Sequence, residues 1–428
     1  MSDRGFGRDI LSVLTSNISG IAIGFAAGIL LSRLLGPDGR GIYASILVVP
    51  GIFASFAMLG SKQSTIFHVG RKTFSEQETL SALFVIFLAT SVLAMLVSVV
   101  AFYVMDNIDL KILFIITAIL TIPARLMIIY SSGFFIGQEK FYYSNILRWL
   151  PELLNLIFIV LLVWILHLNV AGALVAFLLS NLITGLYGVF SLRKTIPLRL
   201  KVDMKIIKSI VKLGLVYAVA LFVMQLNYRV DILILGHYKG KVEVGLYNLG
   251  VAFAMQLWQI PNAIAIVVKT RVANTENPKD LKYVISRLIR LSVIVCAVLS
   301  VALYFISPWI IPLIYGKDFY GSVAMMQAIL PGIMLFVIFR IVSGSIAGIG
   351  RPDVIIKIFI PALIINIVLN YVLIPLYGGI GAAWATNVSY SLGAIATLWV
   401  FSVKMNLPLW QIFRYEKKDF IFKRHASN

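Results

Sequence analysis

Six ionisable side chains stand inside, or near the ends of, long apolar segments of this sequence, where charge is costly and usually functional. Four lie well inside these segments and two lie nearer the ends: Arg125, Arg229, Arg340 and Asp231, then Glu152 and Arg33. The planar guanidinium group of arginine can bind phosphate oxygens through two parallel hydrogen bonds. The arginines are therefore candidates for binding a phosphate-bearing anion, and the two acids are candidates for binding a proton or a cation.

Several of these residues also have a purely structural interpretation. Counted from the Gly-x-x-x-Gly pattern that follows each of them, Arg125 and Arg340 differ by one helical turn, so we expect them to face the same way, as a pair suited to a diphosphate. Both are expected past the membrane midplane on the cytoplasmic side, where each could instead bond carbonyl groups or extend to the interface. Arg33 fits an interfacial anchor equally well, and Glu152 could pair with Arg148 four residues earlier.

Arg229 and Asp231 lie in the same stretch, "NYRVDILILGHY", but they do not neutralise each other simply. Residues two positions apart in a helix point in directions that differ by about 200° around its axis. We therefore expect one of the two to face a cavity and the other to find a partner in a neighbouring helix.

The composition indicates a protein that spans the membrane many times. Of its residues 60% are hydrophobic and 13% are charged, and the mean hydropathy is +0.95. Soluble domains have roughly 45–50% apolar and about 25% charged residues. The net charge of +19 does not predict nucleic-acid binding, because no basic soluble domain is apparent. The single cysteine, Cys296, excludes an intrachain disulfide and is interpreted as a small buried hydrophobe.

Twelve segments are long and apolar enough to be spanning helices, so we expect an all-α protein. They are residues 10–34, 41–61, 79–104, 111–135, 144–167, 170–191, 213–236, 245–268, 287–311, 323–346, 355–376 and 380–403. The fifth and sixth are separated only by "HLN", and the last two only by "YGGIG", which predicts two tight hairpins.

The distribution of lysine and arginine predicts the orientation. With the N-terminus in the cytoplasm, 28 of these residues fall in inner segments and 6 in outer segments. Because cytoplasmic loops are enriched in positive charge, we expect both termini in the cytoplasm.

The basic segment 191–212 divides the spans into six and six. We therefore predict an N-terminal lobe, residues 1–192; a basic cytoplasmic linker, 193–212, that could form an amphipathic interfacial helix; a C-terminal lobe, 213–403; and a basic cytoplasmic tail, 404–428.

The two halves carry the same motifs in the same order. "LLGPDGRGIYA" at 34–44 matches "LILGHYKGKVEVGLYN" at 233–248, if Gly36 is paired with Gly236 and the second turn is taken as four residues longer. In each half a Gly-x-x-x-Gly pattern is followed by an asparagine, Asn155 or Asn366, and then by "GALVAFLLSN" or "GAAWATN". Six spans per half is an even number, so the halves share one orientation and are related by a pseudo-twofold axis along the membrane normal.

These motifs resemble those of the Wzx-type polysaccharide flippases. The residues that carry the resemblance are Leu-Gly-Pro-x-Gly-x-Gly-x-Tyr at 35–43, Asp-x-x-x-Leu-Gly followed by Gly-x-Tyr at 231–247, and "GIGRPD" at 348–353. Such proteins belong to the polysaccharide transporter family of the MOP superfamily (multidrug/oligosaccharidyl-lipid/polysaccharide exporters), which also includes the MATE exporters. The resemblance implies a MATE/MOP-like fold of two six-helix lobes.

The resemblance also implies a function. Wzx-type proteins flip a polyprenyl-pyrophosphate-linked oligosaccharide to the outer leaflet of a bacterial or archaeal cytoplasmic (inner) membrane, for O-antigen, capsule or exopolysaccharide synthesis. The resemblance thus makes the four arginines candidates for binding the pyrophosphate headgroup, and Asp231 and Glu152 candidates for coupling transport to an ion. We expect a secondary transporter and not an enzyme, driven by a proton or sodium gradient, with no metal or other cofactor, because the sequence has no nucleotide motif or metal cluster. The expected partners are the lipid-linked substrate, membrane lipids, and a polysaccharide polymerase and glycosyltransferases, around a monomer. The alternative function is cation-coupled export of drugs or other small molecules.

Overall fold

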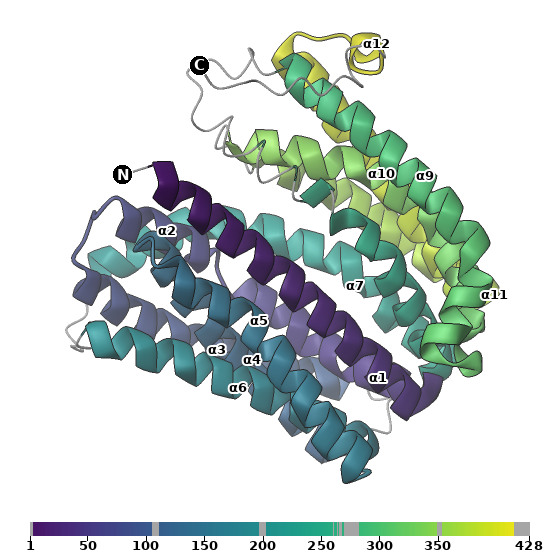
Figure 1. The fold of residues 1–428 in the computed structure, drawn as a ribbon, viewed down its shortest axis with the longest axis horizontal. Helices are drawn as coiled ribbons and strands as arrows, with labels where there is room; N and C mark the ends of the chain where they lie inside the picture. The colour runs from purple at the N-terminus through teal and green to yellow at the C-terminus, as the bar shows by residue number, and fades with distance from the viewer. Residues whose placement is uncertain are drawn as a thin grey trace. The chain divides into compact units, whose positions relative to one another are not determined.

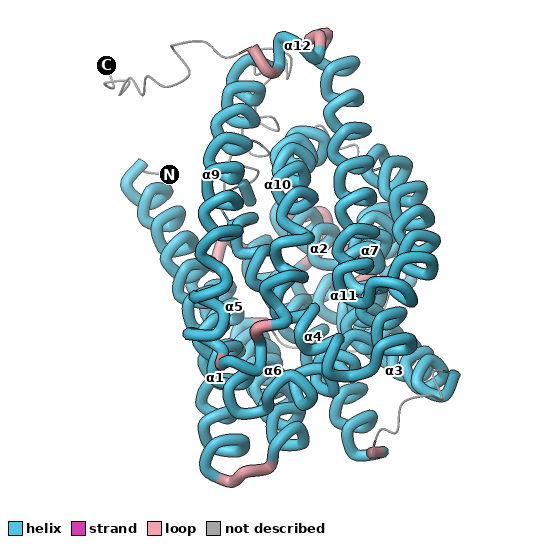
Figure 2. The backbone as a smooth tube through the Cα atoms, turned by 90° about the vertical axis from the view of Figure 1, so that its right-hand side faces the viewer, coloured by secondary structure: helices cyan, strands magenta, loops and turns pink. Residues whose placement is uncertain are grey.

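The computed structural model describes residues 3–104, 111–196, 203–259, 261–262, 264, 268, 282–348 and 353–414. Every secondary-structure element over these ranges is a helix, and short loops join the helices (Figure 2). Nine of the described helices are long and apolar enough to cross a membrane. The chain is therefore a multi-pass all-α membrane protein, as its composition predicts. The exact number of twelve spans stays a prediction.

The described chain forms two compact units, residues 1–245 with 314–319, and residues 246–313 with 320–428. The first contains α1 Asp3–Ala57, α2 Ser61–Gly70, α3 Glu76–Val104, α4 Ile112–Gly137, α5 Phe141–Phe158, the π-helix η1 Ile159–Ile165, α6 Asn169–Thr195, most of α7 Met204–Ala254, and the 3-10 helix η4 Lys317–Phe319. The second contains the 3-10 helix η2 Met255–Trp258, most of α9 Lys282–Tyr315, α10 Gly321–Gly348, α11 Asp353–Met405 and α12 Leu409–Ile412. We call these unit 1 and unit 2.

Three of the long helices are each interrupted at one glycine. These are Gly36 in α1 (φ 65°, ψ −177°), Gly240 in α7 (φ 82°, ψ −174°) and Gly378 in α11 (φ 58°, ψ −136°). Such dihedral angles are essentially restricted to glycine, because a Cβ atom would clash with the backbone. At each of these three positions the sequence predicts a turn between two spans. The structure shows a sharp kink at a single glycine instead, which for "YGGIG" is Gly378.

The kinks correct the predicted alignment of the two halves. Gly240, and not Gly236, has the backbone conformation of Gly36. From each kinked glycine the next motif glycine lies five residues on and the tyrosine seven, at Tyr43 and Tyr247. The pairing of Gly36 with Gly236 was wrong, and so was the inserted length of the second turn. The sequence misled because Leu-Gly occurs by coincidence one turn before the true kink.

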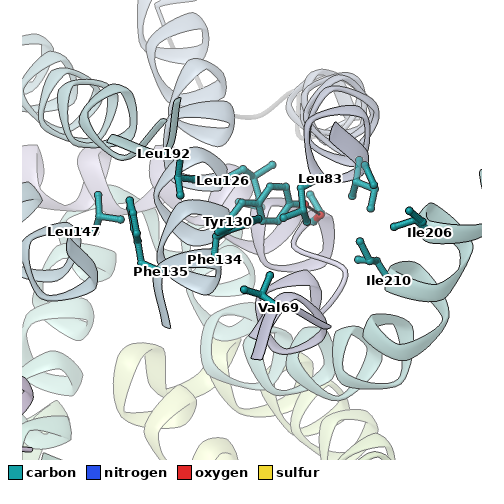
Figure 3. Close-up of a cluster of buried hydrophobic side chains, with 14 of the residues drawn as sticks. Val69, Leu83, Leu126, Tyr130, Phe134, Phe135, Leu147, Leu192, Ile206 and Ile210 are labelled. Atoms are coloured by element: carbon teal, nitrogen blue, oxygen red, sulfur yellow. Dashed lines mark hydrogen bonds between the residues drawn. The ribbon is translucent and has the colours of Figure 1, made fainter. Parts of the chain in front are cut away.

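A buried apolar cluster holds unit 1 together. It joins α2, α3, α4, α5 and α6 to the start of α7, where Ile206 and Ile210 are fully buried (Figure 3). Residues 204–212, predicted to belong to a linker helix on the membrane surface, instead form the first turns of α7. Their apolar face packs against protein, and the interfacial position of this linker stays a prediction. Residues 197–202 of that linker lie outside the described ranges.

The "HLN" hairpin forms as predicted between η1 and α6. His167 (φ 51°) and Asn169 (φ 49°) take left-handed backbone conformations that reverse the chain within three residues. The helix before the turn ends in the π-helical segment η1, a rare conformation that often lies near functional sites. As a result α5 and α6 run side by side in unit 1 (Figure 1).

In unit 2, α10 packs along α11, and an asparagine repairs the break that proline causes in α10. Pro331 lacks a backbone N–H and disrupts the helical hydrogen bonding around it. The N–H of Gly332 donates to Oδ1 of Asn387 (2.8 Å), and Nδ2 of Asn387 donates to the carbonyl oxygen of Ala328 (2.6 Å). The amide of Asn387 thus replaces the missing link between Ala328 and Gly332.

Candidate functional site

A cavity of about 210 Å³ lies inside unit 1, between α4, α5 and α6. It is lined by Arg125, Ile128 and Ile129 of α4, by Pro151, Glu152 and Asn155 of α5, and by Phe177, Ser180 and Asn181 of α6. The polar residues come from the central turns of their helices. This position agrees with the mid-membrane location of substrate sites in secondary transporters.

Close packing of α6 on α4 sets one side of the cavity. A Cβ atom on Gly185 would come within 2.8 Å of the carbonyl oxygen of Ala124, and one on Gly188 within 2.9 Å of the Ser131 side chain. Glycines spaced in this way let two helix backbones approach closely. The approach places Asn181, one turn before Gly185, beside the α4 segment that carries Arg125.

Glycines of α1 set the position of α5 and of its Glu152 side chain. Gly20 packs against the backbone of Trp149 in α5, and a Cβ atom on Gly24 would lie 2.9 Å from Oε2 of Glu152. The Glu152 carboxylate therefore fills the space left by the missing side chain of Gly24. The predicted i,i+4 pairing of Glu152 with Arg148 does not occur, because no ion pair engages Glu152 among the described residues.

Arg125 is half-buried at the middle of α4, roughly 19 Å from either end at about 1.5 Å per residue. Its depth in the membrane, and the alternative that it extends to the interface, stay predictions. Its charge interacts with that of Glu152. Within the described part of the chain, however, its guanidinium group makes no hydrogen bond and no ion pair. Arg125 and Glu152 thus line one cavity as separate charges.

Two asparagines add hydrogen-bonding groups to the same cavity. The Oδ1 atom of Asn155 is buried and has no hydrogen-bond partner among the described residues. Asn181 donates from Nδ2 to the carbonyl oxygen of Phe177 (2.7 Å), which leaves its Oδ1 as an acceptor. Together with Glu152, these side chains present three acceptors to whatever occupies the cavity.

The stretch that carries Arg229 and Asp231 also belongs to unit 1. The guanidinium group of Arg229 packs on α1 at Gly51, 3.7 Å from the position of a Cβ atom there, and its charge interacts with that of Arg125. Asp231 is only 3% exposed, and its Oδ1 accepts a hydrogen bond from the N–H of Ile232 (2.8 Å). Arg229 therefore faces the interior that contains Arg125. Asp231 is instead buried and hydrogen-bonded to the backbone of the next residue.

Two polar residues of the first kink region, Arg40 and Tyr43, were not identified from the sequence as site residues. Arg40, assigned to an outer loop, donates from Nη1 to Ser32 (2.6 Å) and to the carbonyl oxygen of Gly28 (3.2 Å). The ring of Tyr43 lies 6.4 Å edge-on from that of Phe177 in the cavity wall. Both residues lie in the Gly-x-Gly-x-Tyr motif, which indicated the repeat and the family but not a binding site.

Arg33 and Arg340 lie apart from this cavity. Arg33 is exposed and donates from Nε to the carbonyl oxygen of Ile314 (2.7 Å). Arg340, in unit 2, stacks 4.2 Å over the ring of Trp258 and donates to Oδ1 of Asn262 (3.1 Å). Both guanidinium groups are engaged in contacts within the protein. Since Arg125 and Arg340 belong to different units, their pairing around a diphosphate stays a prediction.

The asparagines matched by the repeat have different environments. Asn155 lines the cavity without a partner, whereas Asn366 is fully buried in unit 2 and accepts a hydrogen bond from Asn370 (3.0 Å). The sequence repeat therefore predicts equivalent positions but not equivalent roles. An unsatisfied buried acceptor is unusual and points to a ligand.

Comparison with known proteins agrees with these observations. The family described as Polysaccharide biosynthesis protein matches residues 6–268, and the family described as MatE matches residues 217–372. An uncharacterised membrane protein of Methanocaldococcus jannaschii is 21% identical over 418 residues, which are 94% of this chain and 99% of that protein. A candidate O-antigen transporter of Shigella flexneri is 22% identical over 387 residues, which are 87% of this chain and 92% of that protein.

Two solved structures show the fold. The lipid II flippase MurJ in an inward closed conformation gives a TM-score of 0.77 at 18% identity, covering 94% of this chain and 88% of that chain. A MATE multidrug transporter of the MOP superfamily in an inward-facing conformation gives a TM-score of 0.73 at 16% identity, covering 92% and 98%. The membership predicted from the motifs is confirmed: the chain belongs to the polysaccharide biosynthesis protein family, and its fold is that of the MOP-superfamily transporters.

Proposed function

We propose that this protein flips a polyprenyl-pyrophosphate-linked oligosaccharide from the cytoplasmic to the outer leaflet by alternating access, in the synthesis of a surface polysaccharide. Its family and its fold are those of transporters and flippases, not of enzymes. The predicted positions of both termini in the cytoplasm, the cytoplasmic membrane as its location, and a monomer that works beside a polymerase and glycosyltransferases are parts of this proposal.

The proposal rests mainly on the environment of the Arg125 side chain. A cation in the middle of a spanning helix is costly unless it is paired or functional. Arg125 faces a cavity without a hydrogen bond or ion pair from any described residue, and the charge of Arg229 is close enough to repel it. Two neighbouring arginines are compensated by an anionic ligand, and a pyrophosphate offers enough oxygen atoms for both.

Transport uphill also needs an energy source, for which we propose a proton or sodium gradient. Asp231 and Glu152 are the two acidic candidates for the coupling site. Asp231 is buried away from solvent, and Glu152 lines the cavity. Loss of transport but not of substrate binding in Asp231→Asn would assign coupling to Asp231.

The proposal is tested by replacing Arg125 with alanine. In cells that depend on this protein for a surface polysaccharide, Arg125→Ala should abolish the polymer while the protein remains in the membrane. Purified Arg125→Ala should bind polyprenyl pyrophosphate at least about tenfold more weakly, since charge-assisted hydrogen bonds contribute roughly 1.5–3 kcal/mol. Arg125→Lys should be intermediate, because it retains the charge without the bidentate geometry.

A matched control is Arg71→Ala, which removes an exposed arginine at the end of α2, outside the cavity. It should leave both polymer synthesis and lipid binding unchanged. Normal polymer and normal binding in Arg125→Ala would contradict the proposal.

The alternative function is cation-coupled export of drugs or other small molecules. It is favoured by the MatE match over residues 217–372 and by the Glu152 carboxylate in the cavity. Drug resistance conferred by this protein, without any effect on surface polysaccharide, would favour this alternative over the flippase.

A further inference from the structure

The cavity of unit 1 contains hydrogen-bonding groups of two opposite kinds. Arg125 offers only donors, whereas Glu152, Asn155 and Asn181 offer acceptors that no described residue satisfies. A phosphate group at neutral pH has acceptors to offer but almost no hydrogens to donate. It would therefore satisfy Arg125 and could accept from the amide N–H groups, but it would leave the Glu152 carboxylate and the Oδ1 atoms of Asn155 and Asn181 without donors.

A simple cation does not fit the cavity either. It would suit Glu152 and the two amide oxygens, but it would be repelled by Arg125 and by Arg229 nearby. The occupant must carry negative charge and also several hydrogen-bond donors. Sugar hydroxyl and acetamido groups are such donors, and a glycosyl phosphate combines them with the anion.

The dimensions and walls of the cavity fit one sugar ring. Its volume of about 210 Å³ is smaller than the roughly 300–1,000 Å³ of pockets that enclose a whole small-molecule ligand. It therefore accommodates one group of a larger substrate. Phe177 contributes an aromatic side chain to the wall, and Tyr43 meets its ring edge-on. An aromatic ring beside polar groups is a suitable surface for the apolar face of a sugar.

We propose that Glu152, Asn155 and Asn181 form a subsite that recognises the sugar attached directly to the pyrophosphate, while Arg125 binds the phosphate beside it. This inference rests on the proposed function and adds a recognition step to it. The protein would thus distinguish a lipid carrier that bears its glycan from the bare carrier. Such selectivity would prevent the wasteful return of unloaded carrier through the same pathway.

The test compares two probes on the purified full-length protein in lipid nanodiscs: polyprenyl pyrophosphate, and the same lipid bearing a single N-acetylhexosamine. The wild type should bind the glycosylated probe about tenfold or more tightly than the bare one, since a site built for hydroxyl groups leaves its own polar groups unpaired without them. Asn155→Leu and Glu152→Leu should each reduce this ratio toward one while binding of the bare lipid is retained. Glu152→Gln, which still accepts hydrogen bonds, should retain part of the preference.

Two glycine substitutions provide a test that removes no polar group. A Cβ atom on Gly24 would press on the Glu152 carboxylate, whereas one on Gly28, one turn further along α1, would meet nothing within 4 Å. Gly24→Ala should therefore lower the preference for the glycosylated lipid, and Gly28→Ala should not. The control for asparagine loss is Asn366→Leu, which should reduce thermal stability and leave the preference of the folded protein unchanged.

The outcomes separate this inference from the function on which it rests. If wild type binds both lipids equally, or if the Asn155, Glu152 and Gly24 variants keep the full preference, the sugar subsite is overturned and the flippase proposal stands. If wild type binds neither lipid, the proposed function itself is overturned, and the subsite with it. The expected result has two parts. Arg125→Ala alone should lose binding of both lipids, and the Asn155, Glu152 and Gly24 variants should lose only the preference for the glycosylated lipid.

Discussion

Gly41 and Gly245 pack against each other in a reciprocal contact between α1 and α7, within unit 1. A Cβ atom added to Gly41 would overlap the carbonyl oxygen of Lys241, and one added to Gly245 would overlap that of Pro37. Each of these carbonyl groups belongs to the residue directly after a kinked glycine. The contact therefore has the twofold character that the sequence repeat predicts, and it leaves room only for glycine.

Substitution of either glycine by alanine should destabilise the protein. Gly41→Ala and Gly245→Ala each force a methyl group into backbone atoms, at an expected cost of about 1–3 kcal/mol. Both should lower the melting temperature of the purified protein in detergent. Gly28→Ala is the control, because a methyl group there meets nothing and alanine favours the helix. Equal melting temperatures for the Gly41 and Gly28 variants would show that the contact is looser than described.

The two mid-helix arginines should respond differently to the same change. Arg340→Leu removes a cation stacked on Trp258 and a hydrogen bond to Asn262, so it should cost roughly 1.5–3 kcal/mol of stability. Arg125→Leu removes a cation without such partners and should cost less, because an unpaired charge in the membrane is itself unfavourable. Thermal unfolding of the two variants side by side measures the difference. A larger loss for Arg125→Leu would contradict the assignment of Arg125 to binding.

The amide of Asn387 should be essential to the stability of unit 2. Asn387→Leu leaves the N–H of Gly332 and the carbonyl group of Ala328 without their partner, at an expected cost of about 2–4 kcal/mol. Pro331→Ala in the same background should restore part of the loss, since alanine brings back a backbone N–H and allows a regular helix. The measurement is a double-mutant cycle of melting temperatures. Strictly additive effects would argue against the link between Asn387 and Pro331.

Gly51 should control the position of Arg229. A Cβ atom there would be in ordinary contact with the guanidinium group, 3.7 Å away, so Gly51→Ala should be tolerated. A larger side chain would displace Arg229, and Gly51→Leu should therefore weaken the binding of polyprenyl pyrophosphate by roughly tenfold, the value of one charge-assisted hydrogen bond. Arg229→Gln should weaken binding to a similar degree. Unchanged affinity in both variants would place Arg229 outside the headgroup site.

The sequence by itself determined the class of the protein. Composition and long apolar segments are enough to predict an all-α membrane protein, because a bilayer admits few other folds for such a chain. Glycine and tyrosine motifs indicated the repeat and the family, since a kinked backbone requires glycine wherever the fold recurs. The same motifs led to a wrong pairing of Gly36 with Gly236, because the residue type alone does not reveal which glycine has a positive φ.

Tertiary structure decided the site. Arg125 and Arg340 look equivalent in sequence, yet Arg125 faces a cavity without a hydrogen bond from any residue that the structure describes, and Arg340 is stacked on Trp258. Glu152 could be paired four residues back along its own helix, but Gly24 of α1 gives its carboxylate a place beside the cavity instead. Such differences depend on which neighbouring helix supplies a partner, a ring or an empty space. Sequence spacing describes one helix at a time, and contacts between helices far apart in the chain decide whether a charge is structural or available to a ligand.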